Sequence, residues 1–132
     1  MAKHILDGRT EPGYVAALPG IHDALRFTFR RALGWENAQI RREPLGLKPK
    51  EAEYQWAKFI RAHLASWDAR DAKDEMLPLS DDNVYALNPA LQEAVLGIVM
   101  SQRASDPEPH EDPAAPPAIP DPANAEQADA KN

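Results

Sequence analysis

The clearest pattern in the sequence is an alternation of apolar and polar side chains between positions 25 and 30. The apolar set is Leu25, Phe27 and Phe29, and the polar set is Arg26, Thr28 and Arg30. This is the period of a strand with one buried face. A short apolar segment precedes it at residues 13–18, and Pro19-Gly20 between the two is typical of a turn. The pattern predicts an N-terminal β-hairpin, which must pack on helices because two strands alone are only marginally stable.

After residue 34 the spacing of the apolar residues changes to three and four, which predicts helices. A short helix is expected over residues 35–42, ended by Pro44 and Gly46. A long helix is expected from Pro49 to Trp67. Its apolar stripe comprises Ala52, Trp56, Phe59, Ile60, His63, Leu64 and Trp67. We expect this stripe to form the core with the aromatic face of the hairpin.

Two further helices follow a charged loop. Ser80 is suited to cap a short helix that runs to Leu87, because two aspartates occupy its first turn. Asn88-Pro89 starts the last helix in the same manner, with asparagine as the cap and proline at the first helical position. The predicted buried face of this last helix consists of Leu91, Val95, Ile98 and Val99.

Residues 104–132 differ in composition from everything before them. They alternate proline, alanine and acidic residues, and Ile119 is their only large aliphatic side chain. Such a segment buries too little apolar area to offset its conformational entropy. The sequence therefore predicts one α+β domain over residues 1–103, in which a β-hairpin packs on about four helices. It also predicts a disordered acidic Pro/Ala-rich tail over residues 104–132.

The net charge of −6 belongs to the tail. Residues 104–132 contain seven acidic side chains and one lysine, so they alone carry the net charge of the whole chain. The body is therefore neutral. A neutral body argues against a general nucleic-acid binder, which normally presents an excess of Lys and Arg to the phosphates. A protein partner is favoured.

The sequence lacks the common signatures of catalysis and metal binding. It has no cysteine, and its four histidines are scattered at positions 4, 22, 63 and 110. His63 falls on an apolar stripe, which is typical of a structural histidine. The acidic residues around positions 68–82 lack the glycine and the final glutamate of a calcium loop, and neither a phosphate loop nor a nucleophile elbow is found. We therefore expect no enzyme activity, no catalytic or metal-binding residue and no cofactor.

Hydropathy gives an expectation for location. No apolar run approaches the roughly 20 residues that span a bilayer, and the N-terminal residues become charged before a signal-peptide core is complete. The expectation is a cytoplasmic protein without a membrane partner.

Arginine and tryptophan supply the candidate binding residues. The one basic concentration consists of Arg26, Arg30, Arg31, Arg41 and Arg42. These arginines could simply be solvated on the outer faces of the elements, or they could bind an acidic partner protein or the acidic tail. Binding of nucleic acid is the least favoured of these alternatives. Trp56 and Trp67 are expected in the core, whereas Trp35 follows Gly34 at a helix start and is expected at the surface. The predicted partner-binding residues are Trp35, Arg31, Arg41 and Arg42.

Several short motifs in order along the chain point to one family. They are Phe27-Thr28-Phe29-Arg30, Ser66-Trp67-Asp68 and Leu77-Pro78-Leu79-Ser80, the last of which precedes the final helix. Over residues 13–100 the chain resembles small tail proteins of tailed phages and prophages, in particular the tail assembly chaperones. Members of that family commonly carry a Phe-x-Phe/Tyr-Arg strand, a helix that ends in a Trp-Asp/Asn sequence, and a polar loop before the last helix.

The resemblance implies a role in phage tail morphogenesis. Tail assembly chaperones bind the tape measure protein and keep it soluble while the tail tube forms around it, in the cytoplasm of the host cell. An acidic tail suits this role because like charges keep complexes dispersed. Two alternatives remain at the level of the sequence: a minor virion structural or head–tail adaptor protein, and a small nucleic-acid-binding regulator.

Overall fold

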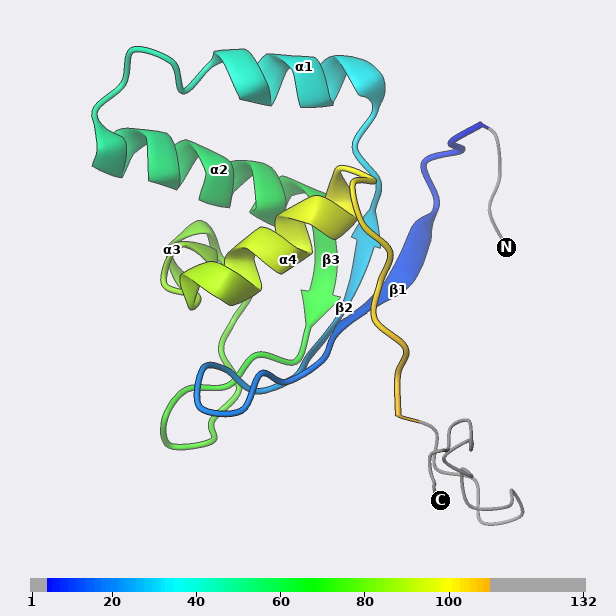
Figure 1. The fold of residues 1–132 in the computed structure, drawn as a ribbon, viewed down its shortest axis with the longest axis vertical. Coiled ribbons are helices and arrows are strands. Elements are labelled where there is room, and N and C mark those ends of the chain that lie inside the picture. Colours follow the sequence, from blue (N-terminus) through cyan, green and yellow to red (C-terminus); the bar gives the residue numbers. More distant parts are fainter. Residues whose placement is uncertain (1–4, 110–132) are drawn as a thin grey trace, which may run out of the picture.

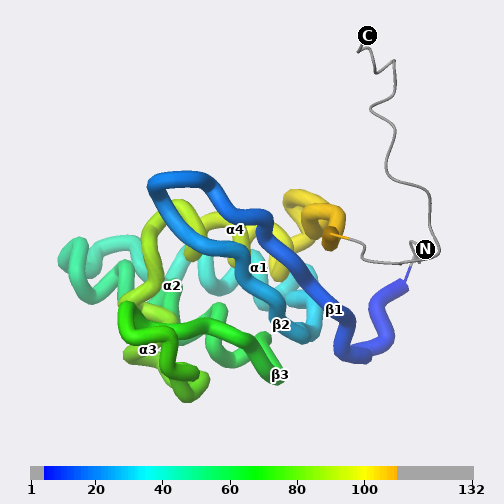
Figure 2. The backbone as a smooth tube through the Cα atoms, turned by 90° about the horizontal axis from the view of Figure 1, so that it is seen from below, coloured from blue at the N-terminus to red at the C-terminus, as the bar shows by residue number. Residues whose placement is uncertain are grey.

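The structure is a computed structural model that describes residues 5–109 (Figure 1). The elements in chain order are β1 (Thr10–Val15), β2 (Leu25–Arg30), α1 (Gly34–Arg42), α2 (Pro49–His63), β3 (Leu64–Trp67), α3 (Asp81–Tyr85) and α4 (Pro89–Val99). The strands form one antiparallel sheet in the order β1-β2-β3, and they lie side by side in the view from below (Figure 2). The predicted α+β fold class is confirmed.

The hairpin forms as the alternation of side chains indicates. Leu25, Phe27 and Phe29 are buried, whereas Arg26 between them is exposed. The turn at Pro19-Gly20 is also confirmed, because Leu18 pairs with His22 across it and Gly20 has a φ of 79°. The first strand lies earlier than predicted, because residues 10–15 pair with the full length of β2 and the chain leaves the sheet after Val15.

The prediction of one continuous helix from Pro49 to Trp67 is wrong at its end. Helix α2 stops at His63, and the next four residues form β3, in which Trp67 pairs with Phe27. At the last position of α2, His63 Nδ1 donates to the Phe59 carbonyl oxygen one turn earlier, at 2.8 Å. The outer edge of β2 offers the backbone a new partner, which a helical pattern in the sequence does not reveal.

The core lies where α2 and α4 cover one face of the sheet. The predicted buried face of α4 is confirmed, as are Leu64 and Trp67. Trp56 and Phe59 are only partly buried, so this part of the predicted stripe is wrong. The fully buried positions of α2 are Ala57 and Ile60, so smaller side chains of this helix face the centre of the core, and Phe59 packs against its edge.

The predicted N-caps of the last two helices, α3 and α4, are both confirmed. The Ser80 hydroxyl accepts from the Asn83 backbone N–H at 3.1 Å, and the Asn88 side chain accepts from the Ala90 N–H at 2.9 Å. Pro89 occupies the first turn of α4, where a backbone N–H would have no partner within the helix, so its absence costs no hydrogen bond.

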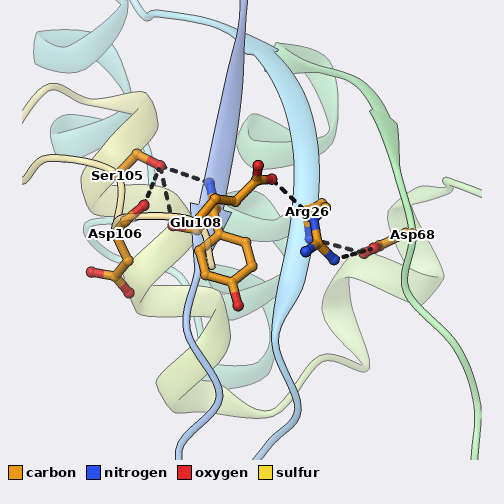
Figure 3. A network of polar contacts seen from close by, with 6 residues as sticks. Arg26, Asp68, Ser105, Asp106 and Glu108 are labelled. Atoms are coloured by element: carbon orange, nitrogen blue, oxygen red, sulfur yellow. Dashed lines mark hydrogen bonds and ion pairs between the residues drawn. The ribbon is translucent and has the colours of Figure 1, made fainter. Parts of the chain in front are cut away.

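The described fold continues beyond the predicted domain boundary at residue 103. Residues 105–108 lie against the hairpin (Figure 3), where Ser105 Oγ accepts from the Tyr14 N–H at 2.7 Å. Asp106 accepts from the Ala16 N–H at 2.9 Å. Since β1 is an edge strand, its outward N–H groups need partners, and this segment supplies them. The predicted disorder over residues 110–132 lies outside the described residues.

Candidate functional site

Helix α1 is attached to the rest of the fold by a polar cluster at its first turn. The Glu36 carboxylate accepts from the Leu33 N–H at 2.8 Å and from both terminal nitrogens of Arg30 at 3.1 and 3.3 Å. His63 Nε2, from the end of α2, lies 3.2 Å from Glu36 Oε1, although it is not aligned for a regular hydrogen bond. Ile40 is the buried apolar contact of α1. One carboxylate therefore joins β2, α1 and α2.

The electrostatics of this cluster favour the charged carboxylate. Burial by itself would raise the pKa of Glu36, but hydrogen bonds from Arg30 and the Leu33 N–H, together with the nearby His63 ring, lower that pKa to about 2. His63 is buried, as expected for a structural histidine, and both of its ring nitrogens face oxygen atoms. The cluster therefore fixes the start of α1 through charge as well as geometry.

Trp35 lies next to this fixed point and is exposed, as predicted. Its exposed fraction is 64%, which is large for a tryptophan beside a rigid cluster. It borders a groove of about 260 Å³ between α1 and α2. The apolar part of the groove comes from Trp35, Ile40, Phe59 and Ala62, and Lys58 and Glu43 stand among its polar residues.

Arg42 shares a face of α1 with Trp35, whereas Arg41 does not. Trp35, Ala38, Gln39 and Arg42 are spaced by three and four residues and line a second hollow on α1. At 3.6 residues per turn, Arg42 is rotated only about 20° from Trp35, but Arg41 is rotated about 120°. We define the Trp35 face as these four residues of α1 together with the groove against α2. Of the arginines predicted to bind a partner, Arg42 belongs to this face.

Arg31 is placed differently from the prediction. Its Nε donates to Glu11 at 2.7 Å, and another of its nitrogens donates to the Ser101 hydroxyl at 3.2 Å. Its guanidinium also lies over the Phe29 ring, 5.3 Å from the ring centre. Arg31 therefore connects β1, β2 and the end of α4, and its charge is compensated within the fold.

The other members of the predicted basic concentration are also separated. Arg26 pairs with Glu108 and Arg30 pairs with Glu36. Within residues 5–109, neither Arg41 nor Arg42 forms an ion pair. The five arginines therefore do not assemble into one basic patch on the described part of the chain.

Sequence reasoning missed two leucines and the groove itself. Leu45 and Leu47, in the loop after α1, are 75% and 40% exposed. They lie in the loop between α1 and α2, so they follow the end of α1 opposite Trp35. The sequence indicates their exposure, because both leucines lie in a Pro/Gly loop and neither belongs to the apolar pattern of a helix or strand. Phe59 gave no such signal, because its spacing fits a buried stripe.

Two other kinds of site are not found among the described residues. Within residues 5–109 there is no group of three or more His, Asp or Glu side chains placed to hold a metal ion. No helix in the same range is long and apolar enough to cross a membrane. Comparison with family models, with curated proteins and with solved structures gives no match. The Trp35 face is therefore supported by its geometry alone.

Proposed function

We propose that this protein is a non-enzymatic protein-binding module and that its partner docks on the Trp35 face. The observation that carries this proposal is the exposure of Trp35, at 64%, between two hollows and on the same helical face as Arg42. Tryptophan and arginine are the residues most enriched among the energetic anchors of protein interfaces. The Glu36 cluster holds this face in place before a partner arrives, which lowers the entropy lost on binding.

The shape and charge of the face suit an amphipathic helix. A groove between two helices accepts apolar side chains spaced by three and four residues. Arg42 and Lys58 each favour an acidic residue of the partner beside them, whereas Glu43, which borders both hollows, favours a basic one. The partner class we propose is therefore a helical segment with an apolar stripe and edges that carry charges of both signs.

The resemblance to tail assembly chaperones gives this partner a specific identity within the proposal. A tape measure protein is an extended helical client, and it has to remain soluble until the tail tube covers it. A virion structural or head–tail adaptor role would use the same face with a permanent partner. The nucleic-acid alternative loses support, because Arg26, Arg30 and Arg31 are paired with carboxylates.

The test is co-expression with the tape measure protein of the same phage or prophage. Trp35→Ala with Arg42→Ala should reduce the soluble yield of the client to the level without chaperone, because both anchors of the face are removed. The melting temperature should stay within a few degrees of the parent, since both side chains are exposed.

A matched control removes one exposed apolar side chain and one arginine elsewhere. Met76 is 55% exposed, and Arg41 lies outside the Trp35 face. Met76→Ala with Arg41→Ala should leave client solubility unchanged. Full client solubility with the Trp35 and Arg42 variant would refute the proposed face. Recovery of this chain from purified particles in stoichiometric amounts would instead establish the virion-component alternative.

A further inference from the structure

The C-terminal strap, which we define as residues 104–109, occupies the outer edge of β1. The Tyr14 N–H donates to Ser105 Oγ at 2.7 Å, and the Asp106 N–H donates to the Tyr14 carbonyl oxygen at 2.9 Å. The Ala16 N–H donates to the Asp106 carboxylate, also at 2.9 Å. Pro12, at the preceding outward position of β1, has no N–H to offer. The strap therefore binds the outward backbone groups that an added strand would bind.

An arginine on the face of the sheet away from the helices completes this docking site. Arg26 Nε donates to Glu108 at 2.9 Å, and the Arg26 guanidinium lies over the Tyr14 ring, 5.2 Å from its centre. Figure 3 shows Arg26 between Glu108 of the strap and Asp68 that follows β3. Tyr14 is buried, with 6% exposed, although it faces away from the helices. The site therefore fits an extended segment with a hydroxyl residue and two acidic residues.

The strap is held without an apolar anchor. Its sequence is Ala-Ser-Asp-Pro-Glu-Pro, so it inserts no large side chain into the core. The Arg26 and Glu108 side chains that pair across it are about half exposed, at 53% and 52%. Exposed ion pairs and single hydrogen bonds contribute little each. The strap can therefore leave β1 while the rest of the core stays intact.

The turn that directs the strap back onto β1 is conformationally strained. Ser101 follows the end of α4 with a φ of 62°, a region that favours glycine. The Gln102 N–H donates to the Gly97 carbonyl oxygen at 2.7 Å, which closes the helix end in the motif that usually carries glycine at this position. A more extended connection between α4 and the strap would release this strain.

We propose that the strap exchanges between two copies of the chain, so that residues 104–109 of each copy dock on β1 and Arg26 of the other. A reciprocal exchange keeps the contacts of the strap with β1 and Arg26, and it replaces the closed Ser101 turn by a more extended connection in both copies. A separate acidic peptide would instead compete with a tethered strap, whose effective concentration is on the order of millimolar. The second copy is therefore the partner that this edge fits, independently of the Trp35 face.

The absence of cysteine allows a direct test in the full chain. One preparation carries Ala16→Cys and the other carries Asp106→Cys, two positions whose groups lie within hydrogen-bond distance in one copy. After mixing and mild oxidation, the two chains should form a covalent heterodimer. In the control, Lys58→Cys on α2 replaces Ala16→Cys. A heterodimer yield no higher than in this control would overturn the proposal.

A second measurement uses the cysteine-free chain and tests the turn. Light scattering over about 10 µM to 1 mM, a range that reaches the effective concentration of a short tether, should detect a dimer. Ser101→Gly should lower the association constant of the dimer by about tenfold, because glycine relaxes the turn in the closed monomer. Ser101→Val should raise it, because a β-branched residue is poorly tolerated there. No dimer, or a dimer insensitive to both substitutions, would refute strap exchange.

Discussion

At the scale of single residues, the Glu36 carboxylate holds α1 because three donors converge on it. The Leu33 N–H and Arg30 are within six residues of Glu36 along the chain, whereas His63 comes from the end of α2 and reaches Glu36 only in the folded chain. The Glu36 pKa falls to about 2 in the folded chain, from an ordinary value of 4.5. A carboxylate whose pKa is lower in the folded than in the unfolded chain stabilises the fold at pH values above its unfolded pKa. This stabilisation is lost as the pH falls and the carboxylate becomes protonated.

This pKa shift predicts an acid-dependent loss of stability. Above about pH 4.5 the Glu36 contribution is fully present, and it disappears as the pH falls toward about 2. Glu36→Gln should lower the free energy of unfolding at pH 7 and flatten its decrease across this window. Urea unfolding at several pH values measures both effects. The control is Glu93→Gln, at an exposed position, and identical pH profiles for the two variants would contradict the prediction.

At the scale of secondary-structure elements, the fit of β1 on β2 depends on one glycine. Gly13 pairs with Phe27, whose ring lies so close that a methyl group on Gly13 would overlap it. The glycine is needed for space, because its φ is not in the left-handed region. Phe27 in turn pairs with Trp67 of β3, so the contact affects the whole sheet.

Gly13→Ala should therefore destabilise the fold by about 1–3 kcal/mol through overpacking. The matched control is Gly34→Ala, at the first position of α1, where an added methyl group meets no atom within 4 Å. That variant should stay within about 0.5 kcal/mol of the parent. Chemical denaturation of both variants measures the difference. Equal stabilities would show that β1 moves away from the ring without penalty.

At the scale of the whole molecule, the position of the domain boundary can be tested by truncation. A chain that ends after Pro109 keeps the strap, and we expect a melting temperature within a few degrees of the full chain. A chain that ends after Arg103 loses the partners of the Tyr14 and Ala16 N–H groups and uncovers the Tyr14 ring. We expect the free energy of unfolding to decrease by about 1–2 kcal/mol, because hydrogen bonds to water replace only part of the lost bonds.

Thermal unfolding of the two truncated chains distinguishes the boundaries. A loss of this size corresponds to a decrease of the melting temperature by roughly 4–16 °C in a domain of about 100 residues. If both truncated chains melt together with the full chain, the fold ends at residue 103 as the composition of the tail suggested.

The sequence by itself determined the local features of this protein. The alternation at residues 25–30 gave the buried face of β2, and the Pro19-Gly20 turn gave the hairpin. Ser80 and Asn88 fixed the starts of α3 and α4. Each of these signals lies within a few residues of the feature it predicts, because capping bonds, turn dihedral angles and side-chain periods are local properties. The exposure of Trp35 was also correctly predicted.

Only the tertiary structure decided the features that depend on distant partners. Residues 64–67 became a strand because the edge of β2 was available, although their spacing continued the pattern of α2. Arg31 was removed from the candidate site because Glu11 and Ser101 lie beside it. Ser105 and Asp106 joined the fold because β1 had unpaired N–H groups. In each case the deciding energy comes from hydrogen bonds and charges between segments many residues apart, which no local pattern encodes.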